Sequence, residues 1–264
     1  MGGRGALPFS WPFPALPNAA YNTATRIVLG LVGTAAKIGL DKLNKIQVHG
    51  PQKELLEALE ARRPVLTFTN HISNIDDPFL WGQLPWKILL DPVRQHMRWA
   101  PCAADLCFTN PVYRWFFSHG QCVPYLRDGS GVYQRGVDFC IERLNQSHWV
   151  HIYPQGRCNL TEQRMRFKWG IGRILAESKE VLLLPFYHMG MDKVMPMLQP
   201  YRPRVGHRVT ILYGKPIPYT PLLQSLVARN ASPREKRKEL TDLCEKKLYE
   251  LWPDAEKLHN VRSD

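Results

Sequence analysis

Short apolar runs rich in β-branched and aromatic residues recur along the chain, and turn-forming residues separate them. Such runs predict buried β-strands. The predicted strands cover residues 64–69, 97–99, the first part of 120–129, 149–154, 181–185 and 209–216. The fifth strand is expected to end at Pro185.

Between the strands, apolar residues recur with the period of an amphipathic helix. This spacing predicts helices over residues 51–62, 131–144 and 234–252, and a helix or loop over 106–117. The helix over residues 131–144 is expected to cover one face of the sheet. Strands separated by helices predict an α/β domain.

An apolar run at residues 27–36 lies between Arg26 and Lys37. A helix needs about 20 apolar residues to span a bilayer, so we expect one that lies at a membrane surface or dips into one leaflet. An ordinary core helix would show the same pattern. Residues 1–45 are therefore predicted to form a membrane-associating segment, and residues 46–264 the main folded domain.

Two further features of the N-terminal segment agree with a membrane location. Its first 40 residues include Arg4 but no Asp or Glu, a composition compatible with mitochondrial targeting. Trp11 and Phe13, set among prolines that prevent a regular helix, are side chains of the kind found at membrane–water boundaries.

The whole chain is basic, because 35 Lys and Arg residues against 23 Asp and Glu residues give a net charge of +12. Such an excess favours anionic partners, either nucleic acid or a phospholipid surface, and also occurs in basic soluble proteins. Basic and aromatic residues alternate over 164–173, as they do in some proteins that bind single-stranded nucleic acid. No nucleic-acid-binding signature accompanies them. An anionic lipid surface explains both the charges and the apolar residues.

The six cysteines show neither a C-x-x-C pair nor a zinc-like spacing with histidine. They stand at positions 102, 107, 122, 140, 158 and 244. A chain of 264 residues can bury a sizeable core and needs no disulfides for stability. We therefore expect reduced, mostly buried thiols and no metal site.

The candidate chemistry lies directly after the strand at residues 64–69, where His71 and Asp76 flank a short loop. Pro78 favours the start of a helix immediately after them. One helical turn takes about 3.6 residues, so side chains five positions apart point to different faces of a helix and can meet only where the chain turns. Asp76 would then hold one ring nitrogen of His71, and the other nitrogen would accept a proton from a hydroxyl group.

In isolation the His-x4-Asp pattern is weak, because an aspartate at this position also caps helices. The pattern is, however, the first signature of the glycerolipid acyltransferases, and segments similar to that family's later blocks follow at residues 120–129, 155–159 and 181–190. The resemblance extends from about Trp11 to Asn260. Residues 11–14, 98–109 and 167–173 further resemble the branch of this family that remodels cardiolipin in mitochondria.

The resemblance implies an α/β fold of the glycerolipid acyltransferase type, with a mixed sheet flanked by helices. It implies catalytic roles for His71 and Asp76, in an acyltransferase domain over residues 46–264. It also implies four substrate-binding residues: Arg127, Gln155, Gly156 and Arg157. The two arginines are expected to bind the headgroup phosphate, and Gln155 to contact the glycerol.

Two of these assignments have an alternative or a complication. The alternative for Arg127 is a solvated arginine in a turn, next to Asp128. Relatives usually carry glutamate where this chain has Gln155, so a negative charge is lost and reduced or altered catalysis is expected. In the last block, Pro185 is expected to shape a pocket, and His188 to be structural.

The expected reaction is CoA-independent acyl transfer from a phospholipid such as phosphatidylcholine to a lysophospholipid, preferably monolysocardiolipin, with no cofactor and no metal. The resemblance implies a monotopic protein of mitochondrial membranes that faces the intermembrane space, with phospholipids and lysophospholipids, including cardiolipin, as partners and no nucleic acid. Two other functions remain open. One is an acyl-CoA-dependent lysophospholipid acyltransferase, and the other is a non-catalytic lipid-binding membrane protein.

Overall fold

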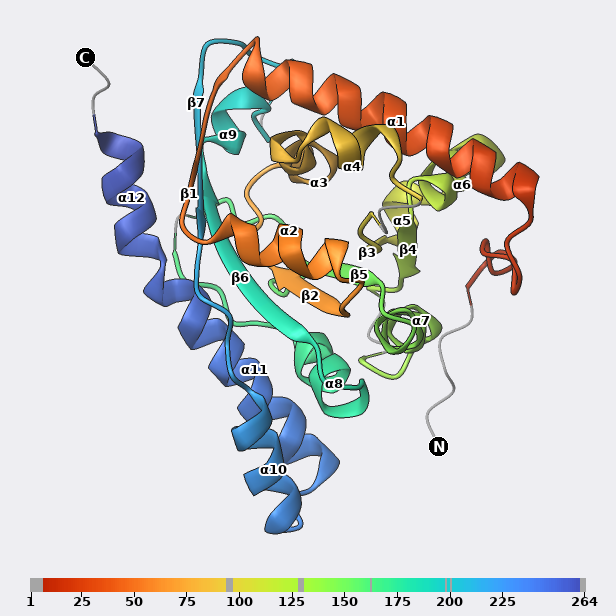
Figure 1. Cartoon of the computed structure of the whole chain (residues 1–264), viewed down its shortest axis with the longest axis vertical. Helices are drawn as coiled ribbons and strands as arrows, with labels where there is room; N and C mark the ends of the chain where they lie inside the picture. Colours follow the sequence, from red (N-terminus) through yellow and green to blue (C-terminus); the bar gives the residue numbers. More distant parts are fainter. Residues whose placement is uncertain are drawn as a thin grey trace.

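The computed structural model describes residues 7–93, 97–127, 131–161, 163–197, 199 and 201–261. Arg4 of the basic N-terminus and Asp128 of the second family block lie outside the described residues. The described strands form a five-stranded sheet and a two-stranded sheet (Figure 1). They are β1 (Lys45–His49), β2 (Val65–Phe68), β3 (Ala100–Ala103), β4 (Cys122–Tyr125), β5 (Trp149–Ile152), β6 (Leu182–Met189) and β7 (Arg208–Tyr213).

The main sheet has the strand order β1-β7-β6-β2-β5. Neighbouring strands run parallel except β6 and β7, which are antiparallel, so the sheet is mixed as expected. β3 and β4 pair with each other in parallel. Because β2 lies between β5 and β6 and runs parallel to both, the carboxyl ends of these strands lie at the same edge of the sheet.

Helices cover both faces of the main sheet (Figure 1). One side of the sheet is contacted by α7, α11 and α12, and α8 packs on α11 on this same side. The other side is covered by α2 and the 3-10 helix η1, and α1 lies over η1. The helices are α1 (Ala19–Asp41), α2 (Gln52–Glu60), α3 (Asp76–Phe79), η1 (Leu80–Gln83), α4 (Trp86–Leu90), α5 (Ala104–Cys107), α6 (Pro111–His119), α7 (Arg135–Asn145), α8 (Gly170–Glu177), α9 (Met191–Val194), α10 (Thr220–Ala228), α11 (Pro233–Glu250) and α12 (Trp252–Asn260).

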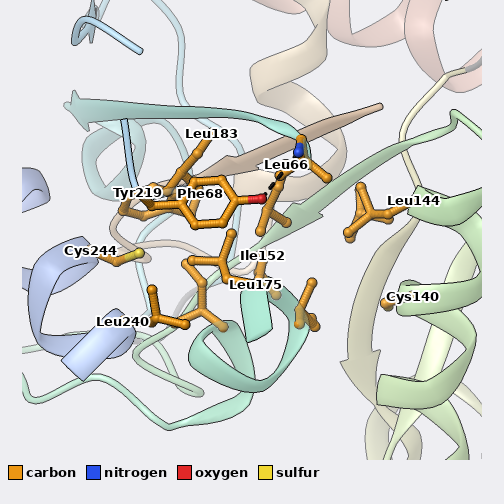
Figure 2. Close-up of a cluster of buried hydrophobic side chains, with 14 of the residues drawn as sticks. Leu66, Phe68, Cys140, Leu144, Ile152, Leu175, Leu183, Tyr219, Leu240 and Cys244 are labelled. Atoms are coloured by element: carbon orange, nitrogen blue, oxygen red, sulfur yellow. Dashed lines mark hydrogen bonds between the residues drawn. The ribbon is translucent and has the colours of Figure 1, made fainter. Parts of the chain in front are cut away.

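Successive residues of the central strands point to opposite faces and join two separate hydrophobic clusters. Leu66 belongs to one cluster, whereas Val65 belongs to the other. Figure 2 shows the first cluster, in which strand residues pack against α8 and α11: Leu66, Phe68, Ile152 and Leu183 from the sheet, with Leu175 and Leu240 from the helices. Apolar side chains on both faces are typical of strands that helices enclose on two sides.

The first helix is longer than the apolar run that predicted it. The side chain of Asn18 accepts a hydrogen bond from the Tyr21 amide and caps a helix of 23 residues. The helix extends beyond the apolar run at both ends, from Ala19 to Asp41, because Asn18 caps its start and the good helix former alanine follows at positions 19 and 20. The expected length, half that of a membrane-spanning helix, was therefore wrong.

β6 continues past Pro185, where the strand was expected to end. Pro185 pairs with Phe68, the last residue of β2, and β6 pairs with β7 from Phe186 onwards. Proline has no amide hydrogen to donate to a neighbouring strand. It is accommodated because it stands where β6 changes from one set of partners to the other.

Two other boundaries differ from the expectation. Of the predicted strand at residues 97–99, only Trp99 forms a bridge, to Val150 of the main sheet, and the chain then passes to the small sheet as β3. The predicted helix at residues 234–252 ends at Glu250, and α12 follows. Pro253 lies in the first turn of α12, where a missing amide hydrogen costs nothing.

Replacing Gly172 by alanine is expected to destabilise the protein by about 1–3 kcal/mol, the usual range for overpacking. α8 packs against α11 so closely that a Cβ atom on Gly172 would lie 2.1 Å from the carbonyl oxygen of Arg237. Chemical denaturation measures the loss. Gly170→Ala in the same helix is the matched control, because its Cβ would meet nothing within 4 Å; equal stability of the two variants would contradict the prediction.

Candidate active site

The candidate site lies in the loops that follow β2 and β5, at the shared carboxyl edge of the sheet. The loop after β2 carries His71 and leads into α3, whose first residue is Asp76. The loop after β5 carries Gln155 and Cys158. Because β2 and β5 are parallel neighbours, their loops leave the sheet side by side.

His71 and Asp76 are in direct contact across the turn. The Nδ1 atom of His71 lies 2.8 Å from Oδ2 of Asp76. The same oxygen accepts hydrogen bonds from the backbone amides of Ile72, at 2.7 Å, and Ser73, at 2.9 Å. The carboxylate is fully buried, so the loop and the imidazole are both fixed to one immobile group.

The electrostatic surroundings favour a charged Asp76. Burial opposes ionisation, but the attraction of His188 and the hydrogen bond from His71 outweigh it and lower the pKa of Asp76. Ring nitrogen Nε2 of His188 lies 3.5 Å from Asp76 and 2.9 Å from the carbonyl oxygen of Asn70. The Asn70 side chain in turn bonds both the amide and the carbonyl of His188, which ties the end of β2 to β6.

The second ring nitrogen of His71 faces Cys158. The Sγ atom of Cys158 lies 3.3 Å from Nε2 of His71, and the ring packs on Tyr153 with centroids 4.3 Å apart. Burial disfavours the charged imidazole, but the hydrogen bonds with Asp76 and Cys158 favour it more strongly, so the pKa of His71 rises to about 10. The His71 side chain remains 21% exposed to solvent.

Gln155 lies behind His71 and is buried. Its Oε1 atom accepts a hydrogen bond of 2.7 Å from the backbone amide of His71, and its Nε2 atom donates to the hydroxyl of Tyr249, at 3.2 Å. The backbone amide of Asn159 also donates to the carbonyl of His71, at 2.6 Å. The loop after β5 therefore holds the backbone of His71 from two sides.

The other predicted site residues lie nearer the surface. Gly156 adopts a φ of +74°, a left-handed conformation that favours glycine. Arg157, next to it, is exposed. Arg127 follows β4 and forms an ion pair with Asp105 of α5. None of the contacts recorded for the described residues joins either arginine to His71 or Asp76.

Two important contacts were not anticipated. The sequence predicts only a reduced thiol at Cys158, although a cysteine with a histidine elsewhere in the chain is a recognised pattern of a nucleophile and its base. Asp77, beside the motif, pairs with the buried guanidinium of Arg98, whose Nε atom donates to Oδ1 at 2.8 Å. Arg98 lies 21 residues after Asp77 in the sequence, so no local pattern predicts that the two residues pair.

Residues 45–189 match the Acyltransferase family model. The chain is 36% identical to Tafazzin of Drosophila melanogaster over 98% of its own length and 69% of that protein. It is 40% identical to the protein named Taffazin of Dictyostelium discoideum, over 71% of this chain and 67% of the other. The chain belongs to the tafazzin family of acyltransferases.

A solved structure shares the fold of this tafazzin-family chain. The crystal structure of the 1-acyl-sn-glycerophosphate (LPA) acyltransferase PlsC from Thermotoga maritima superimposes with a TM-score of 0.59. It covers 95% of this chain and 86% of PlsC at 16% sequence identity. The predicted acyltransferase-type α/β fold is therefore confirmed, and so is the expectation that this chain is a lipid acyltransferase.

Proposed function

We propose that this tafazzin-family protein exchanges acyl chains between phospholipids and lysophospholipids without CoA, with monolysocardiolipin as the preferred acceptor. The observation that carries the proposal is the hydrogen bond between His71 and the buried Asp76, in a chain of this family. It leaves one imidazole nitrogen directed away from the carboxylate, as a general base requires.

In the proposed reaction, the neutral form of His71 takes the proton of the lysolipid hydroxyl through Nε2 while the oxygen attacks an acyl ester carbonyl. Asp76 keeps the imidazole in one tautomer and stabilises its protonated form. Gln155 supports the backbone of His71, and its predicted contact with glycerol remains a proposal. Because an ester of the same type is broken and formed, the exchange is close to thermoneutral and needs no activated donor.

The arginines are proposed to hold lipid phosphate. Arg127 and Arg157 are both solvent-exposed and stand in loops after β4 and β5. A guanidinium stays charged at all relevant pH values and offers forked donors to phosphate oxygens. Arg127 would exchange its exposed ion pair with Asp105 for a lipid phosphate, at small cost because exposed ion pairs contribute little.

The proposed membrane contact is the outer face of α1. By length and composition this helix could cross a bilayer. One side of it packs on α3, η1, α4 and α6, so the helix lies along the domain (Figure 1). The other side exposes Ile27, Leu31 and Ile38 at helical spacing. Large apolar side chains of the neighbouring helices are also exposed: Trp86 and Leu90 of α4, and Val112 and Trp115 of α6.

An apolar surface over adjacent helices fits a protein that lies on one leaflet. We therefore propose that residues 1–45 associate with the membrane and that the protein is monotopic. Membership of the tafazzin family supports a mitochondrial membrane, and we propose the side that faces the intermembrane space. The net charge of +12 favours the anionic headgroups of cardiolipin.

Replacing Leu31 by glutamate is expected to weaken binding to cardiolipin-containing vesicles at least about tenfold. The Leu31 side chain is 68% exposed, and burying a leucine in lipid contributes about 1.5–3 kcal/mol. Vesicle sedimentation measures the partition. Val227→Glu is the matched control, since Val227 is 53% exposed on α10, which lies at the opposite end of the molecule (Figure 1). Equal loss in both variants would argue against α1 as the membrane contact.

The deciding experiment is acyl exchange on liposomes that contain labelled phosphatidylcholine and monolysocardiolipin, in the absence of CoA. Label appearing in cardiolipin supports a transacylase. Transfer that begins only when acyl-CoA is added would indicate the acyl-CoA-dependent alternative, which uses the same His71 chemistry. Liposome binding with no transfer from either donor would indicate a non-catalytic lipid-binding protein.

A further inference from the structure

Three reactive side chains stand in a row at the candidate site. Asp76 bonds Nδ1 of His71 at 2.8 Å, and Nε2 of the same ring lies 3.3 Å from Sγ of Cys158. Nucleophile, base and orienting carboxylate in this order form the arrangement that hydrolases and thiol acyltransferases use to activate a cysteine. It arises here from two loops 87 residues apart in the sequence.

The position of Cys158 distinguishes it from the other thiols. Cys122, Cys140 and Cys244 are buried, and Cys102 and Cys107 are half-buried like Cys158 but have no recorded contact with an imidazole of the described residues. Cys158 is half-buried, and its recorded contacts are polar: His71, and the side-chain oxygen of Asn74 at 3.8 Å. Packing of the core therefore does not explain a thiol at position 158, whereas its contact with the imidazole of His71 does explain one.

We propose that Cys158 is a nucleophile that carries the acyl chain as a thioester between donor and acceptor lipids. The proposal rests on the proposed transacylase function and divides it into two half-reactions. In a CoA-dependent transferase the thiol of the acyl thioester belongs to CoA. In this protein Cys158 would supply that thiol.

In the first half-reaction, the sulfur of Cys158 attacks the carbonyl carbon of the donor's acyl ester, and the bond to the glycerol oxygen breaks. The thiol proton, passed through Nε2 of His71, goes to that oxygen, and the donor leaves as a lysolipid. In the second, the hydroxyl oxygen of the acceptor attacks the thioester carbonyl and His71 takes its proton. The carbon–sulfur bond breaks, and the sulfur recovers the proton or remains paired with the imidazolium.

The charge on His71 is consistent with this sequence of steps. Burial lowers the pKa of His71, but the hydrogen bonds with Asp76 and Cys158 raise it further, to about 10, so the site stabilises the imidazolium that forms when His71 takes the thiol proton. Once the first half-reaction has passed that proton to the departing lysolipid, the imidazole is neutral. The acyl-protein is therefore the state in which His71 is ready to act as the base for the acceptor.

The test loads the purified full-length protein with labelled palmitoyl-CoA and no acceptor, because exchange between two thiols forms and breaks the same type of bond. We expect hydroxylamine-sensitive label on the peptide that contains Cys158, at least about tenfold less in Cys158→Ala and in His71→Ala. Adding vesicles of monolysocardiolipin should then move the label into cardiolipin. Label that stays on the protein would overturn the proposal.

Steady-state transfer from phosphatidylcholine gives the second readout. Cys158→Ala is expected to lose transfer about a hundredfold, with an unchanged melting temperature. Cys107→Ser is the control for unspecific acylation, since Cys107 is also half-buried and its hydrogen bond with Cys102 lowers its pKa; it should behave as the unmodified protein. Full transfer by Cys158→Ala with none by His71→Ala would refute the thioester and leave the proposed function standing. Full transfer by His71→Ala would refute both.

Discussion

Replacing His71 by alanine is expected to reduce CoA-independent acyl transfer at least about a thousandfold. General acid–base groups contribute about a hundredfold to ten-thousandfold to the reactions they serve. In this site the same imidazole forms the recorded hydrogen bonds to both Asp76 and Cys158. Transfer of labelled acyl chains from phosphatidylcholine to monolysocardiolipin measures the change.

The control must separate lost chemistry from lost structure. His207→Ala removes an imidazole from the segment before β7, where the recorded hydrogen bonds of His207 use its backbone amide and carbonyl, and should leave transfer unchanged. Both variants should bind vesicles as the unmodified protein does, because neither residue belongs to the outer face of α1. Transfer by His71→Ala at the rate of His207→Ala would rule out His71 as the base.

The second large effect is expected at Arg98, whose replacement by methionine should destabilise the protein by about 3–5 kcal/mol. Its guanidinium is only 2% exposed and pairs with Asp77, which is 15% exposed. It also donates to the carbonyl of Gly120, at 3.0 Å. Removing one partner of a buried ion pair leaves an uncompensated charge in a medium that solvates it poorly. Urea denaturation measures the loss.

An exposed arginine with equally good partners tests whether burial is the cause. Arg166 pairs with Asp242 and Glu245, both at 2.8 Å, but is 69% exposed. Arg166→Met should cost about 1 kcal/mol or less, because water solvates the remaining carboxylates. Adding Asp77→Asn to Arg98→Met should restore part of the lost stability. Equal losses at Arg98 and Arg166 would contradict this account.

The Arg98–Asp77 pair also bears on the site. Asp77 accepts a further hydrogen bond from the indole of Trp81, and its neighbour Asp76 holds His71. The pair therefore fixes α3 to the segment that leads into β3. Partial loosening of this anchor is expected to impair transfer before the protein unfolds.

The features that sequence predicted well depend on nearby residues. Apolar periodicity placed β2 and α2, and the proline after Asp77 marked the chain reversal that allows His71 to reach Asp76. Family motifs added the acyltransferase fold, which neither composition nor periodicity specifies. The signal for the end of β6 failed because the effect of Pro185 depends on which strand lies beside it.

By itself, then, the sequence determined the alternation of strands and helices, the local turn that joins His71 to Asp76, and membership of a family of acyltransferases. Only the tertiary structure decided that Cys158 faces the second nitrogen of His71, that Gln155 supports its backbone, and that Arg98 neutralises Asp77. Each of these contacts joins distant parts of the chain. The first two exist because β5 lies parallel to and beside β2, and strand order is a property of the whole packed sheet, which no local pattern encodes.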